Sequence, residues 1–388
     1  MENFTFYNPT RVVFGRGTIP SIAETMKKDG VRKLLMVYGM GAIKKNGVYD
    51  SIMKACREQG IQVSELSGVK PNPLLSKVRE GAALIKKSPV DAVLGVGGGS
   101  AIDTAKIVAA SFFYEGDAWD FYGKKVPVTQ ALPIYTVLTT SATGTEMNQM
   151  AVLTHDEEKL KFGIGADPLY PKTTVIDPSI QASLPVEQTI NGGIDTIAHA
   201  LEVYFDGTKN VALPQRYCES IVETVIELLP KLLKDPSDYQ LRAQIAWCST
   251  NALNNTTAAG HAGRGDMASH RISYGPSGLF DVPHGAGLAV IMPAWMRYVY
   301  KEDIETFVSF ARKIFKVKEG TDEEIALEGI DKLQSFYRSL GAPTTLRELG
   351  IGEKDIEPMC RLVATACPIG FLKKLEIDDI RSIYKIAY

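Results

Sequence analysis

The pattern of apolar residues changes near residue 184, and this change constrains the fold more than any other feature of the sequence. Before it, short apolar runs alternate with helical patterns, as parallel α/β domains do. Four of these runs are residues 33–38, 92–96, 134–138 and 174–176. The first part of the chain is therefore predicted to form a parallel sheet covered by helices.

After residue 184, apolar residues recur at helical spacing. Ile221, Val225, Leu228 and Leu232 form one such series, and segments 304–315 and 325–340 behave alike. A chain of 388 residues exceeds the ~250–300 residues at which a single core stops growing. We therefore expect an α/β dinucleotide-binding domain over residues 1–183 and an all-helical, metal-binding catalytic domain over residues 184–388.

The composition favours a small molecule as the binding partner. The net charge is −2 and no lysine or arginine run occurs, which argues against nucleic acid or a membrane surface. No stretch approaches the ~20 apolar residues of a membrane span, and the N-terminus lacks the pattern of a signal peptide. The five cysteines are scattered and form no CxxC pair. We expect a cytoplasmic protein without disulfides.

Asp195 and His199 are four residues apart within a helical pattern, so both side chains lie on one helix face. His270 and His284 follow, on either side of a stretch rich in Gly, Pro and Ser. Together the four residues would complete a set of ligands for a divalent metal. The alternative is that Asp195 caps or salt-links its helix and the three histidines are unrelated.

A triple glycine, Gly97, Gly98 and Gly99, follows an apolar run and is followed by Ser100 and a helical pattern. Free N–H groups at a helix N-terminus bind pyrophosphate well, and glycines let the anion approach. The loop departs from GxGxxG because Ser100 occupies the last glycine position. A tight strand-to-helix turn without a ligand is the alternative.

Taken together, these residues resemble the group III, iron-containing alcohol dehydrogenases, and within them the butanol dehydrogenase and aldehyde reductase branch. The resemblance spans nearly the whole chain. It rests on residues 14–17, 41–50, 68–73, 97–106, 141–148, 195–199 and 283–288. It implies a dehydroquinate-synthase-like fold and a divalent metal held by Asp195, His199, His270 and His284.

The resemblance also implies a nicotinamide cofactor on the N-terminal domain. Gly97, Gly98, Gly99 and Ser100 would hold its pyrophosphate. Asp103 would sit beside the nicotinamide amide as a catalytic-site residue. Other residues of the cofactor groove would be Asn72, near the adenine ribose, together with Thr139, Thr140 and Lys161. Each of these roles has an alternative. Asp103 could be only a charged residue in the first turn of a helix, and Lys161 only a surface lysine. Thr139 and Thr140 could be only hydroxyl residues at the end of a strand.

Cofactor choice can be argued from the end of the strand over residues 34–38. An NAD-selective site places a carboxylate there, which binds the ribose 2′-OH and repels a 2′-phosphate. This chain has Gly39 and Gly41 instead, with Lys44 and Lys45 close behind. The space and positive charge favour NADP over NAD.

An Asp and three neutral imidazoles suit Fe(II), Zn(II), Co(II) or Mn(II), with iron favoured by the family resemblance. Relatives commonly carry a second histidine four residues after the third ligand, where this chain has Tyr274. Tyr274 is a candidate substitute proton donor, or a residue that only packs the pocket wall. Gly275 and Pro276 are expected to loosen a segment that is helical in relatives.

We therefore expect a metal-dependent NAD(P)(H) alcohol dehydrogenase or aldehyde reductase acting on short alcohols and aldehydes. Alternatives are a glycerol or polyol dehydrogenase of the same superfold, a dehydroquinate-synthase-type lyase, and a protein that binds the cofactor without catalysis. Residues 4–14 alternate apolar and polar side chains and are expected to form an edge strand that pairs across a homodimer.

Overall fold

The structure is a computed structural model that describes residues 1–123 and 126–388. It divides into two compact units. One unit contains residues 7–185 and 235–250, and the other contains residues 1–6, 186–234 and 251–388. Two segments therefore depart from a division at residue 184. Residues 235–250 join the α/β unit and residues 1–6 join the helical one.

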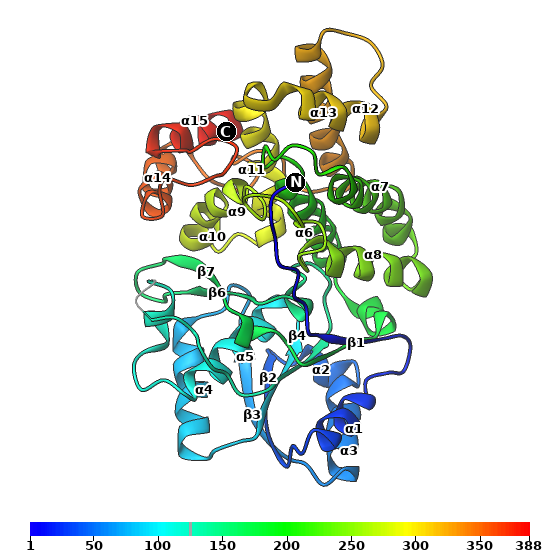
Figure 1. Cartoon of the computed structure of the whole chain (residues 1–388), viewed down its shortest axis with the longest axis vertical. Coiled ribbons are helices and arrows are strands. Elements are labelled where there is room, and N and C mark those ends of the chain that lie inside the picture. The colour runs from blue at the N-terminus through cyan, green and yellow to red at the C-terminus, as the bar shows by residue number, and fades with distance from the viewer. Residues whose placement is uncertain (124–125) are drawn as a thin grey trace. The chain divides into compact units, whose positions relative to one another are not determined.

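The α/β unit is built on a six-stranded sheet in which every neighbouring pair is parallel (Figure 1). Its order is β1 (Arg11–Phe14), β8 (Thr173–Ile176), β5 (Ile134–Leu138), β4 (Ala92–Gly97), β2 (Lys33–Gly39) and β3 (Gln62–Val69). The four predicted strands are confirmed. Of the predicted edge strand over residues 4–14, residues 11–14 form β1 and pair with β8, and residues 4–10 form no strand within this chain.

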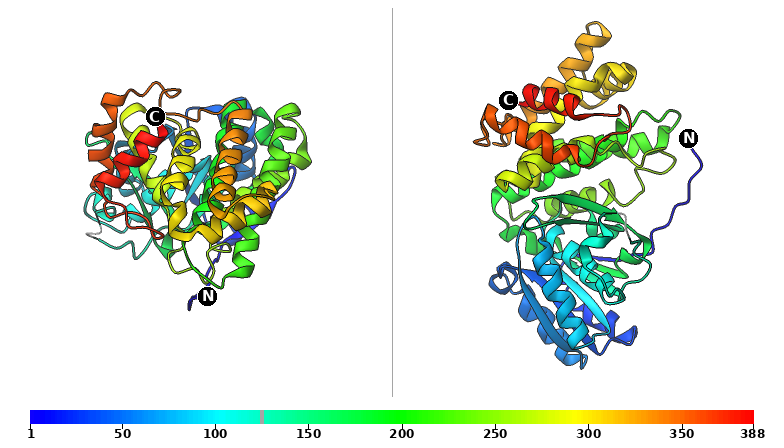
Figure 2. Two further views of the ribbon diagram at one scale, coloured as in Figure 1. Left: turned by 90° about the horizontal axis from the view of Figure 1, so that it is seen from above. Right: turned by 90° about the vertical axis from the view of Figure 1, so that its left-hand side faces the viewer.

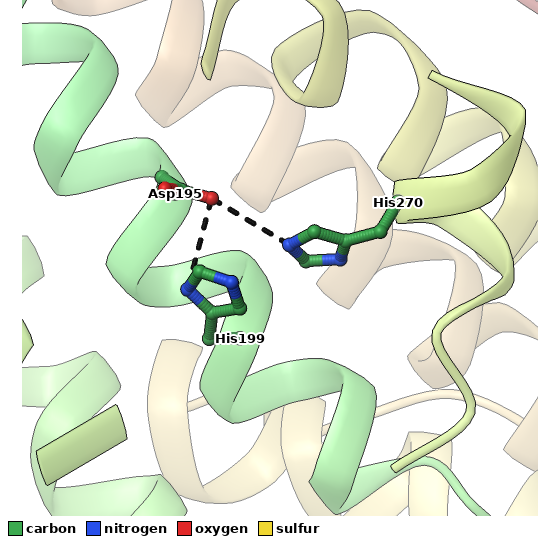
Figure 3. Close-up of side chains that lie close together, drawn as sticks. All are labelled: Asp195, His199 and His270. Carbon is green, nitrogen blue, oxygen red and sulfur yellow. Dashed lines mark ion pairs between the residues drawn. The ribbon is translucent and has the colours of Figure 1, made fainter. Parts of the chain in front are cut away.

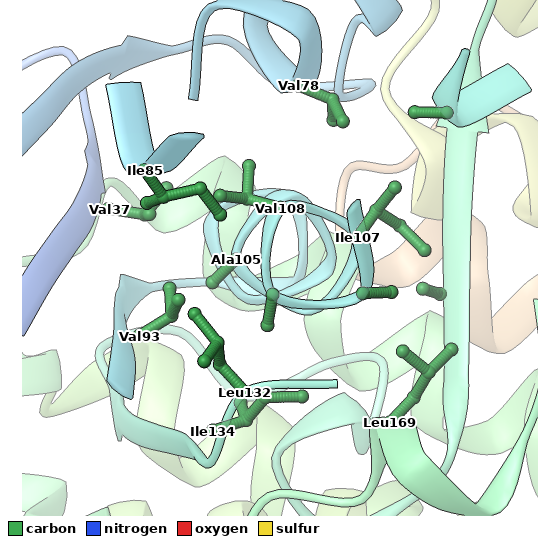
Figure 4. Packing of buried hydrophobic residues seen from close by; sticks show 14 of the residues in the cluster. Val37, Val78, Ile85, Val93, Ala105, Ile107, Val108, Leu132, Ile134 and Leu169 are labelled. Atoms are coloured by element: carbon green, nitrogen blue, oxygen red, sulfur yellow. The ribbon is translucent and has the colours of Figure 1, made fainter. Parts of the chain in front are cut away.

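Helices cover both faces of this sheet (Figure 2). Alternate residues of β2 point to opposite faces. Leu35 and Val37 pack with α4 (Leu75–Lys87) and α5 (Gly99–Ser111), as Figure 4 shows in part. On the other face, the β2 residues Leu34 and Met36 pack with α1 (Ser21–Lys28) and α3 (Val48–Glu58). This two-sided burial explains why the central strands read as continuous apolar runs.

Three smaller features also belong to the α/β unit. The strands β6 (Met150–Thr154) and β7 (Lys161–Gly165) form an antiparallel pair outside the main sheet. The short helix α2 (Ala42–Lys45) follows β2, and most of α8 (Tyr239–Ala252) also belongs to this unit.

The second unit is helical, so the predicted fold class, an α/β domain followed by an all-helical domain, is confirmed. Its central helix α6 (Val186–Tyr204) packs against α7 (Ala212–Lys234) and α11 (His284–Val299). The other helices are α9 (Ala268–Ile272), α10 (Tyr274–Phe280), α12 (Ile304–Phe315), α13 (Asp322–Ser339), α14 (Ile356–Ala364) and α15 (Ile377–Ala387). Within the two described ranges, no helix has the length and apolar character of a membrane span.

Candidate metal centre and cofactor loop

Helix α6 carries Asp195 and His199 one turn apart, and both side chains are buried. The helix can be buried this deeply because its small residues let neighbours approach. A Cβ on Gly193 would overlap the Leu229 side chain of α7. The sequence therefore places a carboxylate and an imidazole inside the helical unit, where a charge without a partner is costly.

The other two histidines come from different helices of the same unit. His270 lies on α9, and His284 is the first residue of α11. A Cβ on Gly285 would lie 2.6 Å from the Cα and 2.7 Å from the carbonyl carbon of Asn191 in α6. Glycine at this position therefore allows the start of α11 to approach the backbone of α6, one turn before Asp195.

The three imidazoles converge on one carboxylate oxygen. Asp195 Oδ1 lies 3.7 Å from His199 Nδ1, 3.5 Å from His270 Nε2 and 3.7 Å from His284 Nε2. Figure 3 shows Asp195, His199 and His270, whose possible ligand atoms all lie within 4.8 Å of one another.

This spacing fits a metal site. Bonds of about 2.1 Å to a tetrahedral ion place ligand atoms about 3.4 Å apart. Asp195 Oδ1 is buried and accepts no hydrogen bond from the residues the structure describes. Asp195, His199 and His270 thus have the donor types, the burial and the spacing that a divalent cation requires. His284 brings a fourth donor nitrogen within 3.7 Å of the same Asp195 oxygen, from a side chain that is 23% exposed.

The electrostatics of the quartet agree with this fit. Burial raises the pKa of Asp195, but the imidazoles of His199, His270 and His284 outweigh it and hold that pKa well below its usual range. Burial lowers the pKa of His270, yet Asp195 and Glu202 together raise it to about 9. The site therefore keeps an ionised carboxylate and attracts positive charge, which a proton or a metal can supply.

Tyr274, the candidate proton donor, begins α10, and its ring centroid lies 6.2 Å from that of His284. The expectation that Gly275 and Pro276 loosen this segment was wrong, because residues 274–280 form a helix. Pro276 falls in the first turn, where the missing N–H costs little.

In the α/β unit, the triple glycine joins β4 to α5 as predicted, with Gly98 at the N-cap. Built Cβ atoms would lie 3.1 Å from Thr140 Cβ at Gly98 and 2.7 Å from Thr143 Oγ1 at Gly99. Thr139 N donates to the carbonyl of Gly97 at 2.9 Å. The structure thus brings Thr139 and Thr140 beside the loop, and a side chain at residue 99 would require Thr143 to move.

Asp103 is buried, and both oxygens of its carboxylate accept hydrogen bonds from other residues of the chain. Thr145 Oγ1 donates to Oδ1 at 2.6 Å and the Val152 N–H donates to Oδ2 at 3.0 Å. Lys106 donates to Thr145 Oγ1 at 2.8 Å, so Asp103 joins a buried network that anchors α5. A direct role for Asp103 beside the nicotinamide remains a prediction.

Two further residues that were predicted to line the cofactor groove lie together, because Lys161 Nζ donates to Asn72 Oδ1 at 2.9 Å. Lys161 is buried, so the alternative of a surface lysine was wrong. Gly39 ends β2 and Gly41 has a φ of 117°, a conformation that favours glycine. Lys44 lies with its Nζ 4.7 Å from the Tyr49 ring centroid.

Sequence reasoning missed the carboxylate behind His270. Glu202 is fully buried on α6, and its Oε1 lies 3.2 Å from His270 Nδ1. The available signal was its spacing, since positions 195, 199 and 202 share one helix face.

Known proteins are similar to this chain over its whole length. The profile of the iron-containing alcohol dehydrogenases matches residues 9–178, and the profile of the C-terminal part of that family matches residues 189–388. The chain is 43% identical to a probable NADH-dependent butanol dehydrogenase of Bacillus subtilis, with 100% of both chains covered. It is 31% identical to the NADPH-dependent aldehyde reductase of Escherichia coli, again over 100% of both.

The fold agrees as well. A crystal structure of NADH-dependent butanol dehydrogenase A from Thermotoga maritima superposes with a TM-score of 0.97 and 47% identity, covering 100% of this chain and 99% of that one. Because the two profiles together span nearly all residues, the chain belongs to the iron-containing alcohol dehydrogenase family.

Proposed function

We propose that the protein is a metal-dependent, NAD(P)(H)-linked alcohol dehydrogenase or aldehyde reductase acting on short-chain alcohols and aldehydes. The observation that carries the proposal is the buried Asp195 Oδ1 with three imidazole nitrogens within 3.7 Å. Family membership and the names of the relatives support the reaction class.

Asp195, His199, His270 and His284 would hold the cation, Fe(II) or Zn(II). When bound, the cation supplies a Lewis acid for the substrate oxygen and the nicotinamide supplies or accepts hydride. Gly98, Gly99 and Ser100 would bind the cofactor pyrophosphate at the N-terminus of α5. Tyr274 would donate or accept the proton of the substrate hydroxyl.

NADP(H) is the proposed preference, with NAD(H) also accepted. Gly39 offers no carboxylate to repel a 2′-phosphate, and Lys44 supplies positive charge nearby. The names of the relatives include both cofactors, since the Bacillus protein is called NADH-dependent and the Escherichia protein NADPH-dependent.

The proposal extends to location and assembly. Each of the five cysteines is a free thiol, which suits the cytoplasm. A homodimer is proposed because β1 stands at the end of the sheet order, so one of its edges can pair with a second copy. Sedimentation at several protein concentrations would test the dimer.

The test of function is metal reconstitution. Protein stripped of metal is loaded separately with Fe(II) under anaerobic conditions and with Zn(II), and oxidation of NADPH or NADH is followed with butanal. We expect turnover only with metal and faster with NADPH. Asp195→Asn keeps the size of the side chain and removes its charge, so it should lose metal and activity but retain NADPH binding.

Three results would count against the proposal. Turnover that is unchanged after metal removal would refute the metal-dependent reaction. A strong preference for vicinal diols over butanol in the reverse direction would favour a polyol dehydrogenase instead. Binding of NADPH with no turnover on any carbonyl would favour the lyase or the non-catalytic alternative.

A further inference from the structure

Glu202 is a fully buried carboxylate in the helical unit, and it faces the back of His270. One oxygen, Oε1, lies 3.2 Å from His270 Nδ1 and accepts the His270 backbone N–H at 3.1 Å. The Ser269 hydroxyl donates to the same oxygen. The opposite ring nitrogen, His270 Nε2, is the one that lies 3.5 Å from Asp195 Oδ1. The imidazole is thus held between two carboxylates.

This arrangement selects one form of the neutral ring. A carboxylate accepts hydrogen bonds and cannot donate one, so contact with Glu202 favours the proton on Nδ1. Nε2 then presents its lone pair toward Asp195. A carboxylate behind a ligating histidine also increases the basicity of the ring and fixes its orientation.

We propose that Glu202 is a positioning residue that holds His270 with its proton on Nδ1 and its Nε2 free to bind metal. This inference deepens the proposed function and rests on it for the metal. Glu202 itself would not touch the metal, the cofactor or the substrate.

Glu202 also has a purely structural task that the experiment must separate. Its backbone carbonyl accepts the Asp266 N–H at 2.8 Å, so it helps to hold the segment that leads to His270. Asp266 is a second buried carboxylate in that segment. It accepts the N–H groups of Ala268, Phe371 and Leu372 at 3.1, 2.6 and 2.7 Å. Asp266→Asn is therefore the matched control for replacement of a buried carboxyl group that supports the same loop.

The experiment measures Co(II) binding by full-length protein, in competition with a chelator and by the visible absorption of the bound ion. Glu202→Gln keeps an acceptor oxygen and removes the charge, and we expect affinity about 10-fold weaker with a changed spectrum. Glu202→Met removes the acceptor too, and we expect a loss of about 100-fold. Asp266→Asn should keep the wild-type spectrum. Circular dichroism checks that each variant is folded.

Selective ¹⁵N labelling of the five histidines gives a second readout that a structural role would not move. In metal-free protein at a pH where the imidazoles are neutral, the His270 proton should reside on Nδ1 in the wild type. It should redistribute to Nε2 in Glu202→Met.

The outcomes are distinct. Wild-type affinity and spectrum in Glu202→Gln, or an equal change in Asp266→Asn, would overturn the positioning role. If the wild type binds no Co(II), the proposed metal function fails. The ¹⁵N measurement then still decides whether Glu202 sets the His270 tautomer, and a proton on Nε2 in the wild type would overturn that as well.

Discussion

Gly39 is the residue on which cofactor choice can be tested most directly. It ends β2, and a Cβ there would lie 3.4 Å from the carbonyl oxygen of Val69, which a side chain can accommodate. A carboxylate at this position would repel a 2′-phosphate and accept the ribose 2′-OH. Gly39→Asp should therefore lower kcat/KM for NADPH about 10-fold or more relative to NADH, a difference of about 1.4 kcal/mol. Initial rates with both cofactors measure it.

Gly39→Ala is the control for added bulk, and it should change the two cofactors equally. An equal loss for NADPH and NADH in Gly39→Asp would contradict the argument, because it would show a steric effect without charge discrimination.

Tyr274 is the second residue whose role can be tested directly. If its phenol carries the proton of the substrate hydroxyl, Tyr274→Phe should lower kcat about 10²-fold with little change in cofactor binding. Tyr274→His should restore part of the rate, since imidazole is also a proton carrier. Steady-state rates at several pH values provide the measurement. Unchanged turnover in Tyr274→Phe would leave Tyr274 as a packing residue.

Single residues also show which parts of the candidate site could be predicted from the sequence and which could not. The quartet at 195, 199, 270 and 284 was predicted from residue type, the spacing of Asp195 and His199, and the family resemblance, and the structure brings all four together. The buried carboxylate of Glu202 was not identified, because its contact with His270 joins residues 68 positions apart. The burial of Lys161 against Asn72 depends likewise on packing between distant segments.

Among the elements, α10 shows how a helix can contain Gly275 and Pro276. Pro276 cannot donate to the carbonyl of Ile272, four residues earlier. The hydroxyl of Tyr384, on α15, donates to that carbonyl at 2.6 Å instead. A Cβ on residue 275 would overlap this hydroxyl, so Gly275 makes room for it. The pattern of residues 273–280 could not reveal this hydrogen bond, because its donor comes from the C-terminal helix. Strands such as β4 were predicted well, because their burial is visible in their own apolar runs.

This contact predicts a stability effect. Tyr384→Phe leaves a buried carbonyl without its donor and should destabilise the protein by about 1–3 kcal/mol. Tyr337→Phe is the matched control. Tyr337 is also fully buried, but within the described residues its hydroxyl has no hydrogen-bond partner, so its removal should cost little. Urea unfolding followed by circular dichroism compares the two, and equal losses would refute the role of Tyr384.

For the whole molecule, the division into two units separates the residues proposed to bind the metal from those proposed to bind the cofactor. The four candidate metal ligands all belong to the helical unit, and the glycine loop belongs to the α/β unit. The change in periodicity predicted a boundary near residue 184. It could not assign residues 235–250 to the α/β unit, since α8 is a helix like those before and after it, and its place depends on packing with distant segments.

The division leads to a prediction for hydrogen exchange. A ligand that binds only the native state stabilises it and slows exchange most in the elements that hold it. Adding Zn(II) to metal-free protein should protect amides in α6, α9 and the first turn of α11, and leave β4 and the start of α5 largely unchanged. NADPH should protect the loop between β4 and α5. Asp195→Asn should abolish the effect of Zn(II) and keep that of NADPH. Protection by Zn(II) spread evenly over both units, or kept in Asp195→Asn, would place the metal elsewhere.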